Sequence, residues 1–269
     1  MLRALVHTAS AAVLGTVLAA APLSATDVAP LRGSAAGPEV AAAPDAARHG
    51  HTAPTSSGSR PGTGNTRELV ILVHGMGRSP ASMWLLGRRL ERSGYRVVRF
   101  GYPSTRGTVA EAGAALSRRA SERMGDAPRV HFVGHSLGTV IIRCMLAHAP
   151  PPRAGRVVML APPNQGAAAA DRWARWIGWA MPYVRELGTM AGSPARSLAL
   201  PDGVEAGIIA GAWDGKVRVA ETRLAGARDH VVVRAFHSFL MNRRDVHRLV
   251  DRFLRHGRFS PPPSVDATP

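Results

Sequence analysis

Gly134-His135-Ser136-Leu137-Gly138 is the stretch of this chain best suited to carry chemistry, because it reads G-x-S-x-G. A serine in this pattern occupies the tip of a sharp turn from a strand into a helix, where its hydroxyl is exposed as a nucleophile. The apolar residues 130–133 and 139–148 on its two sides predict that strand and that helix. Glycine at both flanking positions is a steric requirement, since strand and helix approach too closely there for a Cβ atom.

A second loop could stabilise the anion that forms when a serine attacks an acyl carbon. Residues 68–74 form a nearly continuous apolar run, and the letters H-G-M-G at 74–77 end it. A loop at this place supplies one backbone N–H group to the oxyanion, and we expect Met76 to offer it and Leu137 to offer the second. We expect His74 to brace this loop rather than to act as a base.

The elements that must position these groups alternate between strands and helices. Short, β-rich apolar runs predict strands, and stretches of helical periodicity predict the helices between them. The sequence therefore predicts an α/β fold, with a mostly parallel sheet, helices on both faces, and the site at the carboxyl ends of the strands. The predicted strands are residues 68–74, 95–100, 130–133, 155–161, 205–211 and 230–236, and the predicted helices are residues 79–92, 108–123, 139–148 and 245–254.

The alternation is interrupted between residues 167 and 200, after the strand that ends near Ala161. Trp173, Trp176 and Trp179 follow one another at intervals of three and predict one aromatic face of a short helix. We expect these tryptophans to line or cover an acyl-binding pocket, because their segment interrupts the sheet on the side where the site must lie. The alternative is that they cover the hydrophobic core.

The two ends of the chain differ in composition from its middle. Residues 1–25 have the features of a signal peptide, with Arg3 near the start, an apolar core of about a dozen residues and a small residue at the cleavage position. We therefore expect export to the periplasm or the cell exterior, and an uncleaved membrane anchor is the alternative. Residues 26–66 predict a disordered leader, residues 67–258 one folded domain, and residues 259–269 a disordered proline-rich tail.

The formal net charge is +16, and nearly all of the positive charge comes from arginine. Nucleic acid is not an expected partner, because there is no binding motif and no basic stretch interleaved with aromatic residues. The charge could attract anionic surfaces of the cell envelope, or it could reflect an arginine-rich composition on solvated helix faces.

No side chains have the spacing of metal ligands, so neither a metal nor a cofactor is expected. The sequence does not specify an oligomeric state.

Together these motifs resemble those of the α/β-hydrolase superfamily, and within it the small secreted bacterial lipases and esterases. The resemblance covers about residues 68–258. It rests on H-G-M-G at 74–77, G-H-S-L-G at 134–138, A-P-P-N-Q-G at 161–166, D-G-K-V at 214–217 and A-F-H-S-F at 235–239. Lys216 departs from the pattern, in which Thr or Val is more common at this place.

The resemblance implies hydrolysis of a carboxylic ester or lipid through an acyl-enzyme. Ser136 would be the nucleophile, His237 the general base and then acid, and Asp214 the residue that orients the imidazole. The order serine, aspartate, histidine along the chain is the one that this fold uses. An acyltransferase, a thioesterase or a perhydrolase would use the same triad, and a catalytically silent binding module on the same fold is a further alternative.

Asp214 is the expected acid because a triad acid must follow closely after the carboxyl end of a strand. Only Asp214 does so, after the run at residues 208–211. Glu221 lies in the loop that returns to the other edge of the sheet and is the competing candidate. The remaining acidic residues upstream of His237 precede strands, at the opposite edge; they are Asp202, Glu205 and Asp229.

Overall fold

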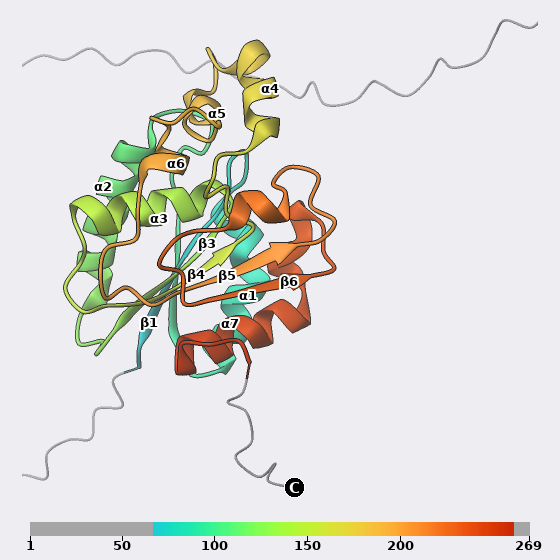
Figure 1. Ribbon diagram of the computed structural model, residues 1–269. Helices are drawn as coiled ribbons and strands as arrows, with labels where there is room; N and C mark the ends of the chain where they lie inside the picture. Colours follow the sequence, from blue (N-terminus) through green and yellow to red (C-terminus); the bar gives the residue numbers. More distant parts are fainter. Residues whose placement is uncertain (1–66, 261–269) are drawn as a thin grey trace, which may run out of the picture. The chain divides into compact units, whose positions relative to one another are not determined.

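The computed structural model describes residues 67–260 of the 269-residue chain (Figure 1). The predicted signal peptide and leader, and residues 261–269 of the predicted tail, lie outside the described residues. Six strands form one parallel sheet in the order β2-β1-β3-β4-β5-β6. The strands are β1 (Leu69–Val73), β2 (Arg96–Phe100), β3 (Val130–His135), β4 (Ala154–Leu160), β5 (Ala206–Gly211) and β6 (Asp229–Val233).

Helices cover both faces of this sheet, as the sequence predicts. Figure 1 shows α2 and α3 on one side and α1 and α7 on the other, with α4 and α5 together at the top of the view. The α-helices are α1 (Trp84–Arg92), α2 (Val109–Met124), α3 (Leu137–His148), α4 (Ala168–Ile177), α5 (Pro182–Glu186), α6 (Pro194–Ser197) and α7 (Arg244–His256), and the 3-10 helices are η1 (Pro80–Met83), η2 (Val219–Thr222) and η3 (His237–Asn242).

The interior strand β1, between β2 and β3, shows why this sequence forms a sheet covered on both faces. All five of its side chains are fully buried. Alternate residues point to opposite faces, so Ile71 packs with α2 and α3 whereas Leu72 packs with α1 and α7. An unbroken apolar run is therefore what both faces require.

The observed elements differ from the predicted ones mainly at their ends. β6 ends at Val233 rather than at residue 236, because its partner β5 ends at Gly211 and leaves the following residues without a strand to pair with. Phe259 belongs to the folded part rather than to the tail. Its ring is buried 4.9 Å from that of Phe253, and its N–H group donates to the Asp229 carboxylate at 2.7 Å.

The register of the sheet brings the carboxyl ends of the strands to one edge. Val73 of β1 pairs with Gly134 of β3, and Gly211 of β5 pairs with Val233 of β6. The loops that follow these strands therefore lie along the same edge, where open parallel sheets bind their ligands. Among the described residues, no helix is both long enough and apolar enough to cross a membrane.

Candidate active site

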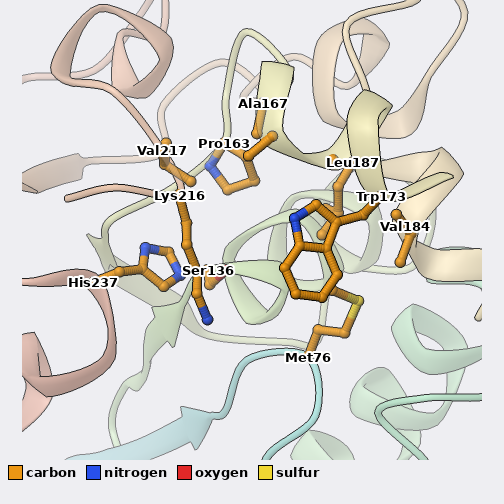
Figure 2. Close-up of a pocket in the computed structure, with 12 residues that line it drawn as sticks. Met76, Ser136, Pro163, Ala167, Trp173, Val184, Leu187, Lys216, Val217 and His237 are labelled. Atoms are coloured by element: carbon orange, nitrogen blue, oxygen red, sulfur yellow. The ribbon is translucent and has the colours of Figure 1, made fainter. Parts of the chain in front are cut away.

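Ser136 lies at the turn between β3 and α3 in a strained backbone conformation. Its φ is 53° and its ψ is −122°, values that a non-glycine residue adopts only under constraint. Its N–H group donates to the Leu160 carbonyl of β4 at 2.9 Å, which ties the turn to the neighbouring strand. The side chain lines a cavity, beside His237 in the view of Figure 2. Such strain is stored where a side chain must be presented for function.

The two glycines around Ser136 are required for close packing, and this prediction is confirmed. A Cβ atom on Gly134 would lie 2.8 Å from the backbone nitrogen of Thr139. A Cβ atom on Gly138 would lie 2.7 Å from the His74 carbonyl oxygen, where the backbone of α3 crosses that of the β1 loop. Contacts this short do not occur for real side chains, so both positions exclude any residue larger than glycine.

His237 and Asp214 form a buried pair in the segments that follow the last two strands. Nδ1 of His237 donates to Oδ2 of Asp214 at 2.6 Å, and the Asp214 side chain is fully buried. The other oxygen of Asp214 accepts the backbone N–H groups of Lys216 and Val217 at 2.8 and 2.9 Å. Because Nδ1 carries the shared proton, Nε2 of His237 is free to accept a proton from the cavity side.

Figure 2 shows the imidazole of His237 directed toward Ser136, and both side chains line the same cavity. Glu221, the competing acid, lies elsewhere. Its carboxylate accepts from the side chain and backbone of Arg218 and from the Ala168 N–H at the start of α4. The structure thus brings Ser136, His237 and Asp214 together and leaves Glu221 with contacts that hold η2 against α4.

The loop after β1 approaches Ser136 from the other side. Met76 lines the same cavity as Ser136. Within residues 67–260, neither the Met76 N–H nor the Leu137 N–H donates to a protein acceptor. Two unpaired amides beside a nucleophile are the arrangement that stabilises an oxyanion. His74 is buried in this loop, stacked on Tyr102 at 4.4 Å between ring centroids, and its ring bonds to the Gly75 carbonyl.

The cavity has a volume of about 100 Å³ and walls that are mostly apolar. Ala169, Ala170 and Trp173 contribute one wall from α4, and Val184 and Leu187 contribute another from α5 and its end. Figure 2 shows the Trp173 indole facing the cavity across from Lys216. The segment between β4 and β5 therefore forms much of the cavity, with only one of its three tryptophans in the wall.

Trp176 and Trp179 do not line this cavity. They are 80% and 81% exposed, and α4 has no buried residue. Trp176 lies one turn further along α4 from Trp173, and Trp179 lies beyond the helix end at Ile177. The expected aromatic face is thus interrupted, and these two side chains neither line the catalytic cavity nor cover the core.

His135, inside the G-x-S-x-G motif, is a site residue that the sequence analysis missed. Its Nε2 donates to the His237 carbonyl at 2.9 Å, and the two rings lie 4.9 Å apart between centroids. Burial holds the pKa of His135 well below its usual value, and the nearby His237 lowers it further. A neutral His135 therefore fixes the main chain of His237. The one sequence feature that could have identified His135 is its position next to Ser136 in the G-x-S-x-G motif.

No group of three or more His, Cys, Asp and Glu side chains in the described part of the chain could hold a metal ion. The remaining polar contacts near the cavity join loops. Nδ2 of Asn164, in the A-P-P-N-Q-G stretch, donates to the Thr222 carbonyl at 2.8 Å and holds η2 beside β4.

A model of the alpha/beta hydrolase family matches residues 70–265. A search of curated proteins found no match. Among solved structures, the chain is similar to Aspergillus fumigatus lipase B, with 15% identity, a TM-score of 0.59, and coverage of 72% of this chain and 54% of that one. It is also similar to a Bacillus licheniformis lipase in its mature form, with 18% identity, a TM-score of 0.51, and coverage of 65% and 87%.

A metagenomic carboxyl esterase is similar at 18% identity and a TM-score of 0.53, with 70% of each chain covered. At these identities the solved structures show a shared fold. The family model covers most of the chain, including the strand ends that carry Ser136, Asp214 and His237. This chain belongs to the alpha/beta hydrolase family.

Proposed function

We propose that this protein is a serine hydrolase that cleaves carboxylic esters. The observation that carries the proposal is the Asp214–His237 hydrogen bond of 2.6 Å, which orients an imidazole toward Ser136 on one apolar cavity. Ser136 follows β3, Asp214 follows β5 and His237 follows β6, and this arrangement supports nucleophilic catalysis by a serine. The lipase and esterase neighbours share this fold and support an ester as the substrate.

In the proposed reaction, Nε2 of His237 takes the proton from Ser136 as its oxygen attacks the acyl carbon. The amides of Met76 and Leu137 donate to the oxyanion that forms. His237 then gives the proton to the departing alcohol, and the acyl-enzyme is hydrolysed by a water that His237 activates in turn. Asp214 holds the imidazole in the required tautomer throughout and stabilises its charged form.

The acyl chain would occupy the cavity between α4 and α5, because its walls are apolar and Ser136 lies at its side. Trp173 contributes the largest side chain to these walls. Removal of its indole should enlarge the acyl site, whereas Trp176 lies outside the wall and is the matched control. The expected change is a shift of preference toward longer acyl chains.

The test is hydrolysis of p-nitrophenyl esters of increasing chain length by four proteins: the wild type, Ser136→Ala, Trp173→Ala and Trp176→Ala. We expect activity in the wild type, none above background in Ser136→Ala, and a preference shifted to longer chains in Trp173→Ala alone. Full activity of Ser136→Ala would remove the proposed nucleophile. If Trp176→Ala changes the chain-length preference and Trp173→Ala does not, the proposed location of the acyl site is wrong.

A further inference from the structure

Lys216 is the only lysine in the chain, whose 34 Lys and Arg residues are otherwise arginine. It follows the triad acid by two residues, and its backbone N–H group donates to Asp214. Its exposed side chain lines the catalytic cavity together with Ser136 and His237. Figure 2 shows it extended across the view between His237 and Trp173. A strongly hydrated ammonium group therefore lies at the mouth of an apolar cavity.

Lys216 also lines a second, wider hollow that adjoins the first. This hollow has a volume of about 500 Å³ and shares Met76, Trp173 and Lys216 with the catalytic cavity. Its other walls combine the polar side chains of Arg78, Ser79 and Ser82 with Gly77 and Met181. The site thus has an apolar compartment and a cationic compartment, and they meet at the mouth beside Ser136 and His237.

A hydrogen bond to the main chain holds the Arg78 side chain in this hollow. Its Nη2 donates to the Ser238 carbonyl at 3.0 Å, which leaves further N–H groups of the guanidinium for a ligand. In the part of the chain that the structure describes, neither Arg78 nor Lys216 forms an ion pair with a carboxylate. Two cations with no anionic partner therefore face one hollow.

Both charges act inside the active site. Burial is the main cause of the lowered pKa of His135, and the positive charges of Arg78 and Lys216 are among the further causes. The two side chains thus contribute to the electrostatic potential next to His237. A ligand that brought a negative charge to the hollow would be attracted by both groups.

We propose that Arg78 and Lys216 bind an anionic group on the alcohol side of the ester, while the acyl chain enters the apolar cavity. This inference rests on the proposed ester hydrolysis and names its substrate class: carboxylic esters whose alcohol part carries a phosphate or another anion. Arg offers a fork of donors that suits phosphate and carboxylate, and Lys adds a point charge.

The test compares 1-octanoylglycerol 3-phosphate with 1-octanoylglycerol, which share the acyl chain and the ester bond. The measured quantity is the ratio of kcat/KM for the anionic ester to that for the neutral ester. Lys216→Thr removes the positive charge and should lower the ratio about tenfold, as expected for the loss of one partly exposed charge-assisted hydrogen bond. Lys216→Arg should keep the ratio.

Arg118→Thr is the matched control, because it removes one positive charge from the exposed surface of α2, away from both hollows. We expect an unchanged ratio in this variant. The wild-type ratio should fall with added salt, whereas a steric role of Lys216 would not respond to ionic strength.

A second pair of substrates, the octanoyl esters of 4-hydroxybenzoate and 4-hydroxybenzamide, distinguishes a phosphate site from a general anion site. If the wild type prefers the anionic ester in both pairs, the hollow binds anions in general. If it prefers the anionic ester in the glycerol pair alone, the hollow is specific for phosphate.

Equal ratios in the wild type and Lys216→Thr would overturn the inference and leave ester hydrolysis intact. A ratio that falls as far in Lys216→Arg as in Lys216→Thr would also overturn it, since the charge is then not the cause. Failure of the wild type to hydrolyse either ester would overturn the proposed function and this inference together. Melting temperatures measured alongside show that the variants are folded.

Discussion

The Asp214 carboxylate is fully buried, and three hydrogen bonds fix its position. One joins it to Nδ1 of His237, and two come from the backbone amides of Lys216 and Val217. These partners hold both carboxylate oxygens in place. The carboxylate can therefore hold His237 in one tautomer and stabilise the imidazolium that forms when Ser136 is deprotonated.

Replacement of Asp214 by Asn should lower kcat by about 10³ to 10⁴, because the amide keeps the shape but favours the wrong tautomer of His237. The free energy of unfolding should change much less than activity does. Steady-state hydrolysis of a p-nitrophenyl ester and urea unfolding measure the two quantities. Glu221→Gln is the control, since Glu221 contacts Arg218 and α4 rather than His237. Near-wild-type turnover in Asp214→Asn, with turnover lost in Glu221→Gln, would contradict the assignment.

The sequence was sufficient to place Ser136, Asp214 and His237 beyond the carboxyl ends of strands, because each comes after an apolar run, although β6 ends earlier than predicted and His237 begins η3. It could not predict the contacts that hold them. His135 bonds to the His237 carbonyl across 102 residues, and Arg78 bonds to the Ser238 carbonyl across 160 residues. Such contacts depend on how loops meet at the sheet edge, and no local pattern encodes them. Whether the triad performs catalysis stays a prediction.

Among the elements, the strands and long helices were the most predictable. Their interiors are apolar runs or amphipathic stretches that the sheet buries on both faces, and the α/β-hydrolase prediction is confirmed by the fold and the family match. The segment between β4 and β5 was not predictable in detail. Its helices α5 and α6 have five and four residues, too few for a periodic pattern, and α4 has no buried side chain.

The crossing of α3 over the β1 loop gives a prediction at the scale of elements. Gly138→Ala would place a Cβ atom against the His74 carbonyl, and backbone atoms cannot move aside as a flexible side chain can. We expect the free energy of unfolding to fall by about 3 kcal/mol, measured by urea unfolding. Gly192→Ala is the control, because nothing lies within 4 Å of its added Cβ, and a change below about 0.5 kcal/mol is expected there. Equal effects of the two substitutions would contradict the close approach.

The molecule as a whole buries several of its histidines. Burial is the main cause of a lowered pKa in five of them, against an ordinary value of 6.5: His74, His131, His135, His230 and His247. In the unfolded chain these groups take up protons near their ordinary pKa. In the folded protein they remain neutral until a lower pH. The unfolded state therefore binds more protons as the pH falls through this range.

The free energy of unfolding should consequently be larger at about pH 7.5 than at about pH 5.5, because stability rises with pH wherever the unfolded state binds more protons. Glu186 acts in the opposite direction at lower pH, since burial raises its pKa above 4.5. Urea unfolding at the two pH values tests the expectation, and His135→Gln should reduce the difference by removing one titrating group. Equal or greater stability at the lower pH would refute this explanation.

The most direct measurement of the central claim is covalent labelling by a fluorophosphonate, followed by peptide mass spectrometry. The account predicts one adduct on the peptide that contains Ser136, because the strained turn and the His237–Asp214 pair activate that hydroxyl. Ser136→Ala should fold and remain unlabelled. An adduct on another residue, or undiminished labelling of Ser136→Ala, would contradict the claim that Ser136 is the nucleophile of this hydrolase.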